Sequence, residues 1–136
     1  MSIVHNIENA LLPDFRAISG IEQVLATEPR AVPRLLPVVT WEFAGGDPVM
    51  AETGPGDDTT YAWLLRLYVR CSDMSDAQDS FKTLVPPLLA VPRSNPRADD
   101  TADILSIRSA GEGPEYVIEE GYAVMGFVLT ARLTET

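Results

Sequence analysis

The residues that usually carry catalysis or bind metals are scarce in this sequence. Cysteine and histidine each occur once among 136 residues, at Cys71 and His5. One cysteine cannot form an internal disulfide or supply a cysteine-based zinc cluster. A Ser-His-Asp triad would have to be built on His5, and no Gly-x-Ser-x-Gly elbow is present. We therefore expect no catalytic residue, no metal site and no cofactor, with Cys71 as an inert thiol on the inward face of a strand.

Long apolar runs and basic residues are scarce as well. No run of about 18 apolar residues exists, so no transmembrane helix is expected. The N-terminus lacks the cationic start of a signal peptide, which predicts synthesis in the cytoplasm. The 20 acids outnumber the 10 bases and give a net charge of −10. This charge argues against binding to nucleic acid or to anionic membranes by the overall field. The acids either keep the protein soluble or line a surface that repels DNA.

Alternation of apolar and polar positions is the most regular pattern that is present. From Thr60 to Cys71 every odd position is apolar, and Gly121 to Leu133 repeats the alternation. Such alternation predicts β-strands with one buried face. At roughly 3.3 Å per residue the first of them would run about 40 Å, roughly twice a usual strand. Two strands of this length build a sheet larger than so small a core needs, which points toward assembly more than toward a pocket.

Helical spacing is found in two shorter segments. Ser2 can cap a first helix whose apolar stripe ends near Leu12, because Pro13 removes a helix donor and restricts the residue before it. A second helix is expected to begin within Ser72 to Asp76, and Pro86-Pro87 should kink or end it. The segment from Asp14 to Arg34 is interpreted mainly as coil, with one helical turn at most.

The remaining strands complete the predicted fold. Leu35 to Phe43 predicts a first strand and Ile104 to Ile107 a third, and Gly121 marks a possible bulge in the last strand. The prediction is a single α+β domain over 1–136, with a mostly antiparallel four-stranded sheet, helices packed on one face, and the order α-β-β-α-β-β. The expected core contains the following side chains: Trp63, Leu65, Leu67, Phe81, Leu84 and Phe127.

An acidic segment joins the first two expected strands. Residues 44–59 hold four glycines, two prolines and four acids, and no base. This composition predicts a long, mobile loop. None of the adjacent acid pairs in the chain follows the calcium-loop pattern, so they are interpreted as solvated turn residues.

Several of these features occur together in one known family. They are a Leu-Pro strand start (Leu36-Pro37-Val38-Val39), a W-x-L-x-L-Y-V strand at 63–69, an SDMSDAQ helix start at 72–78, and a Y-x-V-x-G-F-x-L-T strand at 122–130. With a short N-terminal helix and a long loop, the chain resembles the tail terminator (tail completion) proteins of long-tailed bacteriophages and related gene-transfer particles. The resemblance covers about residues 1–133 and rests on the length of the chain, the order of its elements and these local residue patterns.

The resemblance implies a virion structural protein without catalytic residues. In that family six copies form a ring that caps the tail tube, ends its polymerisation and offers a docking face to the head-tail connector or stopper protein. DNA passes through the ring. The implied partners are other copies of the chain, a tail tube protein and the connector, with no membrane. The implied location is the tail-neck region of the virion, with assembly in the host cytoplasm.

The charges of the chain agree with this interpretation. A ring through which DNA slides should not present a positive lumen, because counterion release would favour binding. The loop acids are therefore candidates for the lumen or for a docking face: Asp47, Glu52, Asp57 and Asp58. Arg66, Arg70 and Arg132 on the long strands are candidates for pairing with acids of a neighbouring copy in a ring-closing contact.

Two other interpretations remain open. The chain could be another neck or tail-tube subunit of the same particle; a tube protein should carry longer hairpins and assemble open-endedly, whereas a terminator should stop at a closed ring. It could also be a small α+β ligand-binding protein or enzyme, which would need a concave pocket with convergent polar groups.

Overall fold

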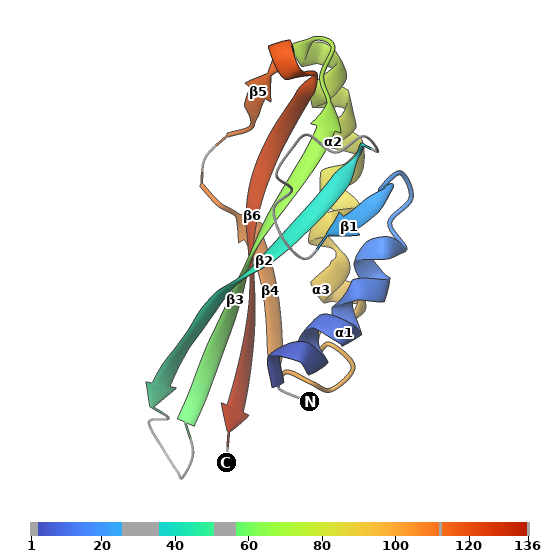
Figure 1. The fold of residues 1–136 in the computed structure, drawn as a ribbon. Coiled ribbons are helices and arrows are strands. Elements are labelled where there is room, and N and C mark those ends of the chain that lie inside the picture. The colour runs from blue at the N-terminus through green and yellow to red at the C-terminus, as the bar shows by residue number, and fades with distance from the viewer. Residues whose placement is uncertain (1–2, 26–35, 51–56, 112, 136) are drawn as a thin grey trace.

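The computed structural model describes residues 3–25, 36–50, 57–111 and 113–135, which form one sheet with helices on one side (Figure 1). In chain order the elements are α1 (Ile3–Arg16), β1 (Gln23–Leu25), β2 (Val38–Met50), β3 (Asp57–Arg70), α2 (Met74–Leu89), α3 (Val91–Ser94), β4 (Ile104–Ser109), β5 (Glu115–Val117), the 3-10 helix η1 (Ile118–Glu120) and β6 (Tyr122–Glu135).

The sheet has six strands rather than the predicted four. Its order is β1-β2-β3-β6-β4, with β5 also paired to β6. Four strands match the predicted ones, and all pairings among them are antiparallel. The prediction missed β1, which pairs parallel to β2 and makes the sheet mixed. It also missed β5 as a separate strand, because η1 and the left-handed Gly121, at φ +82°, interrupt the chain before β6 begins. Gly121 therefore ends η1 and is not a strand bulge.

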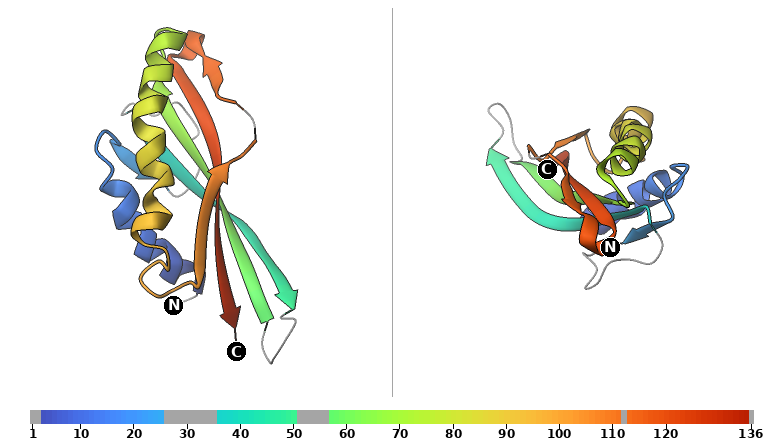
Figure 2. Two further views of the ribbon diagram at one scale, coloured as in Figure 1. Left: turned by 180° about the vertical axis from the view of Figure 1, so that it is seen from behind. Right: turned by 90° about the horizontal axis from the view of Figure 1, so that it is seen from above.

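The core lies between the sheet and the helices, as the alternation predicts. Side chains from α1, α2 and one face of the sheet form a single buried cluster, and all six predicted core residues belong to it. The helices cover the same face in both views of Figure 2. Trp63 is fully buried there, and its Nε1 donates a hydrogen bond of 3.0 Å to Oε2 of Glu8 on α1. The predicted α+β class and the one-sided packing are confirmed.

The first helix runs one turn further than predicted. Pro13 lies inside α1, on its exposed side, and the helix ends at Arg16. The extra turn buries Phe15, whose ring packs edge-on against Trp41 with centroids 5.7 Å apart. Burial of one large aromatic side chain can offset much of what an interior proline costs. The stop predicted at Leu12 was therefore wrong.

The second helix begins and ends close to the predicted positions. Asp73 caps it, since its side chain accepts a hydrogen bond of 2.8 Å from the Asp76 backbone N–H. Pro86 and Pro87 are exposed, while Leu84 and Leu88 on the inner side are buried, so α2 continues to Leu89 before it ends.

The three long strands extend past the helical layer. β2 has 13 residues, and β3 and β6 have 14 each. Their lower ends in Figure 1 leave the helices behind and run on together. A bulge between Phe43 and Gly45, where Gly45 has φ +117°, shifts the register of β2 against β3 at the start of this extension. We call the extension the arm: residues 43–50 of β2, 57–62 of β3 and 131–135 of β6.

Candidate assembly interface

The segment predicted as a loop largely forms the arm. Residues 44–50 and 57–59 lie in strands β2 and β3, so strand pairing replaces the loop predicted for them. Asp47 pairs with Thr60, Asp58 with Val49, and Asp57 with Met50 in the ladder. Glu52 falls in 51–56, outside the described residues. The structure therefore gathers Asp47, Asp57 and Asp58 at one end of the sheet, as positions of a β-hairpin. The mobility of the segment stays a prediction.

Burial decreases along each strand as it enters the arm. On the helix side of β2, Trp41 is 4% exposed and the next residue on that side, Phe43, is 43% exposed. On β3, Trp63 is fully buried, whereas Tyr61 is half-buried; on β6, Ala131 is buried and Leu133 half-buried. Phe43 packs against both rings of β3, with centroid distances of 5.7 Å to Trp63 and 6.4 Å to Tyr61. The core face thus continues beyond the helices as an apolar patch.

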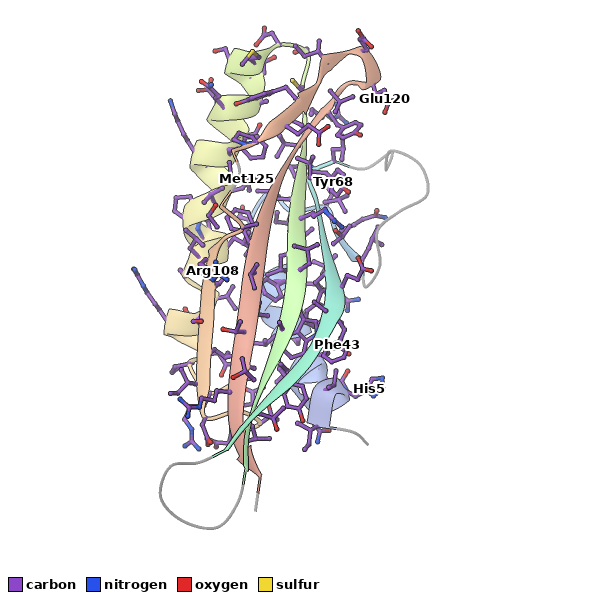
Figure 3. The ribbon with its side chains drawn as sticks, turned by 90° about the vertical axis from the view of Figure 1, so that its left-hand side faces the viewer. His5, Phe43, Tyr68, Arg108, Glu120 and Met125 are labelled. Atoms are coloured by element: carbon purple, nitrogen blue, oxygen red, sulfur yellow. The ribbon has the colours of Figure 1, made fainter. Side chains whose placement is uncertain are left out.

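The face of the sheet that points away from the helices is also partly apolar. None of the described helices lies on it, and we call it the helix-free face. It is formed by alternate residues of neighbouring strands, which Figure 3 shows side by side in the order β4, β6, β3 and β2. Leu64, Val124 and Val128 are half-buried in its middle. The register places the arginines on this same face: Arg66, Arg70, Arg108 and Arg132.

The three arginines predicted as inter-subunit contacts differ in their surroundings. Arg66 lies 3.7 Å from the Glu42 carboxylate within the same copy. Arg70 is exposed at the upper end of β3, where it pairs with Tyr122, and Arg132 is exposed near the arm, beside Ile104 of β4. The sheet thus brings all three to one face but spreads them along its length. A contact to a neighbouring copy stays a prediction for each of them.

Sequence reasoning missed Arg108. It is exposed on β4, opposite Val128 of β6, and lies on the same face as the predicted arginines. Figure 3 shows it at the β4 side of the sheet. The signal was weak because β4 has only six residues and its apolar residues do not alternate strictly. Pairing with the long, clearly alternating β6 is what fixes its face.

Two edges of the sheet are open among the described strands. β1 pairs only with 38–40 of β2, so the rest of β2 is paired on one side, to β3. At the opposite edge β4 pairs only with β6 and carries Ile104, a large apolar side chain that is 58% exposed. Unpaired strand edges are sites where further chains can add.

The described residues line hollows on both sides of the sheet. One hollow of about 200 Å³ lies on the helix-free face, where Arg66, Glu115 and Gly126 line it with their neighbours. Another, of about 440 Å³, lies beside β1 and is lined in part by Arg16 and Glu22. Both are open to solvent.

The one cysteine and the one histidine of the chain lie in different parts of the fold. Cys71 is buried, and its Sγ donates to the Asp73 carbonyl oxygen at 3.4 Å, while His5 is exposed on α1. Within the part of the chain that the structure describes, no group of three or more histidines, cysteines, aspartates or glutamates is arranged to hold a metal ion. None of the described helices is both long and apolar enough to cross a membrane.

The likeness found by comparison with known proteins is structural. No family model matches the chain, and no curated protein matches it. Among solved structures, a chain from the structure described as "Virion of native gene transfer agent (GTA) particle" is similar over 95% of this chain and 92% of that chain. The identity is 14% and the TM-score 0.49. These values are too low to assign a function to this chain.

Proposed function

We propose that this chain is a structural subunit of a phage-like particle, a tail terminator that closes into a ring at the end of the tail tube. The observation that carries the proposal is the arm. Strands of 13 and 14 residues continue past the helices, although a usual strand has about five or six. The extension adds little to the core of a single copy, because its helix side is only partly covered.

The surfaces that the long strands leave exposed are suited to assembly. The apolar patch of the arm, the half-buried middle of the helix-free face and two open sheet edges are all available to other chains. Interfaces combine such apolar surface with polar and charged residues, and here arginines lie on the helix-free face while acids occupy strand positions of the arm. A repeated, head-to-tail contact between such unlike surfaces closes into a ring when the rotation between copies allows it.

The further roles follow from the family that the sequence resembles. A ring of six copies would sit on the tail tube, stop its polymerisation and present its other side to the head-tail connector or stopper protein. The net charge of −10 suits a channel through which DNA passes without being held. The chain acts as a scaffold in this proposal and carries out no catalysis, with its place in the tail-neck region of the virion.

The arm also favours a second candidate. A tail-tube subunit needs long hairpins to stack one ring on the next, and the β2–β3 hairpin is long. The two candidates differ in how assembly ends, since a tube protein keeps adding rings and a terminator stops after one.

The test is a mass measurement across protein concentration, with electron images of the same samples. A terminator should give one closed species whose mass stays constant as concentration rises, and rings of uniform diameter. Added to purified tail tube protein, it should shorten or cap the tubes. Open-ended tubes of the chain alone would favour the tube subunit. A single copy at every concentration, with no effect on tube growth, would contradict both.

A further inference from the structure

We propose that the open edge of β4 in one copy pairs with the open edge of β2 in the next copy, so that one antiparallel sheet continues between copies. The inference rests on the proposed function, because it names the contact by which copies assemble. It commits to a second copy of this chain as the occupant. The directions of the strands, their register and the side chains at the two edges carry it.

The two open edges run in opposite directions. The strands lie in the order β2, β3, β6 and β4, and each neighbouring pair is antiparallel. Figure 3 shows β2 and β4 at opposite sides of this unit. Because four is an even number, β2 and β4 point opposite ways. A rotation about an axis along the strands, as in a ring, keeps these directions, so β4 of one copy meets β2 of the next as an antiparallel strand.

The open parts of the two edges lie at the same level of the sheet. Among the described strands, β1 covers the outer edge of β2 only at 38–40. Beyond it, Phe43 lies opposite Trp63 of β3, and Trp63 lies opposite Leu129 of β6. Leu129 in turn lies opposite Ile107 of β4. A copy rotated without a shift along the strands therefore brings Phe43 beside Ile107 of its neighbour.

The backbone groups at this level point outward on both edges. Residues of an antiparallel strand direct their N–H and C=O groups to one neighbour and the other in turn. The Ala110 N–H donates to the Gly126 carbonyl oxygen at 3.0 Å, so the alternation turns the backbone groups of Ile107 away from β6. Followed across the sheet, the same alternation turns those of Phe43 away from β3. The two residues can therefore form a hydrogen-bonded pair between copies.

The contact has a defined length. Trp41 is level with Ser109 by the same register, and this pair also turns its backbone groups outward. In the other direction the contact ends, because the Leu105 N–H already donates to the Pro96 carbonyl oxygen at 3.2 Å. The bulge at Ala44 interrupts β2 at that point as well. The contact thus joins 41–43 of one copy to 107–109 of the next.

The side chains of these segments match on each face. On the helix side, Phe43 is 43% exposed and Ile107 is half-buried, so apolar groups meet. On the helix-free face, Glu42 and Arg108 are level with each other and both exposed, so an acid meets a base. Glu42 lies 3.7 Å from Arg66 of its own copy and can accept from a second guanidinium, because a carboxylate has two oxygens.

A disulfide introduced across the junction tests the contact. Glu42 and Arg108 would form a non-hydrogen-bonded pair with Cα atoms about 4.5 Å apart, which a disulfide can bridge. Within one copy three strand spacings, about 14 Å, separate them, which is too far. The variant with Glu42→Cys and Arg108→Cys, assembled and then oxidised, should give a series of covalent oligomers that ends at the ring on a non-reducing gel.

Matched controls separate the register from mere proximity. Glu42→Cys with Ser109→Cys moves the second thiol by one residue to the opposite face and should give no covalent oligomers. Each single variant should give none either, since Cys71 is buried. A mixture of Glu42→Cys with Arg108→Cys should give covalent dimers and nothing larger. Circular dichroism and thermal unfolding of all variants show whether each one is folded.

The backbone part of the contact is tested by Ser109→Pro. Proline removes an N–H that points away from β6, so the ladder inside the copy is kept. The association constant of each contact should fall about fivefold or more, because a hydrogen bond between copies is lost. Ser109→Ala is the control: it loses the same hydroxyl, which accepts from the Gly111 N–H at 3.3 Å, and should assemble like the original protein.

The outcomes decide between the inference and its alternatives. Covalent oligomers from the double variant, with dimers from the mixture, support the edge-to-edge contact. If the original chain forms rings and the assembled double variant stays uncrosslinked, the inference is overturned while the proposed function stands. Covalent dimers from Glu42→Cys alone would show that β2 edges pair with each other, which also overturns it.

Two further outcomes are decisive. If the double variant does not assemble, equal assembly of Ser109→Pro and Ser109→Ala overturns the inference. If the original chain never assembles, the proposed function fails and the inference fails with it.

Discussion

Two regions of the sheet, the part covered by the helices and the arm, are built from the same strands but differ in how they are packed. Under the helices, alternate residues of β3 and β6 are buried in a cluster shared with α1 and α2. In the arm the strands stay paired to their ends, apart from the bulge at Ala44, but Phe43, Tyr61 and Leu133 remain partly exposed. The comparison teaches that backbone pairing and core packing are separable: the first continues to the ends of the strands, and the second stops where the helices stop.

This division predicts where substitutions act. A substitution under the helices should lower the free energy of unfolding of a single copy. It should reduce assembly only because less of the protein is folded. A change in the arm should leave the single copy stable and affect the association between copies. The following experiments test the division, in order of decreasing expected effect on stability.

The largest effect is expected for Phe127→Ala. Phe127 is 1% exposed and sits opposite Leu65 in the centre of the covered sheet. Removal of a buried aromatic side chain leaves a cavity and should lower the free energy of unfolding by about 3–5 kcal/mol. Urea titration of both proteins measures the difference. A neutral result would mean that the inward side of β6 had been assigned to the wrong face.

A smaller loss is expected for Glu8→Ala. The substitution removes the acceptor of the Trp63 indole N–H, which is buried against α1. A buried donor without a partner costs about 1–3 kcal/mol. Glu8→Gln is the matched control, because its carbonyl oxygen can accept the same bond and should restore most of the stability. Equal losses in the two variants would show that the hydrogen bond is not the cause.

A substitution in the arm should have a small effect on the stability of the single copy and a larger effect on association between copies. Phe43→Ser changes a half-exposed side chain beyond the helices and should lower the unfolding free energy of the single copy by only about 1 kcal/mol, mainly through the lost ring contacts with Tyr61 and Trp63. Association should weaken, because the apolar patch loses its largest exposed member. Urea titration and sedimentation of the same sample separate the two quantities. Strong destabilisation without loss of association would remove the distinction between arm and core.

The smallest effect is expected for His5→Ala. The side chain is exposed on α1, on the helix side of the sheet. Both stability and ring formation should stay within experimental error of the original protein. If the variant folded and assembled but particles made with it lost function, His5 would have a chemical role that a scaffold does not need.

The sequence predicted those elements whose pattern is set by burial on one side. The alternation at 60–71 and 121–133 identified β3 and β6 with their inward faces, because one face meets the helices. It failed where tertiary pairing overrides composition. Glycine and proline at 45–50 favour a loop, yet β3 provides a ladder partner for each of these residues. β1 was not predicted, because three residues are too few to show a periodicity and only their pairing with β2 makes them a strand.

The candidate interface was predictable in part. Charge counting identified the acidic segment and three arginines before any fold was known. It could not show that Arg66 has an acid of its own copy at 3.7 Å, nor that Arg108 shares the face. Both facts depend on which residues lie opposite each other on neighbouring strands, and no local pattern contains that information.

The bulge between Phe43 and Gly45 has a consequence for how the arm can vary in length. Side chains of a strand alternate between faces, so the one extra residue at Ala44 exchanges the sides for every position of β2 beyond it. Deletion of Ala44 would remove the bulge and leave Gly45 opposite Ala62. Deletion of one residue beyond the bulge would turn the rest of β2 to the opposite face, whereas deletion of two would only shorten the strand. Natural variation in the length of this arm should therefore come in steps of two residues.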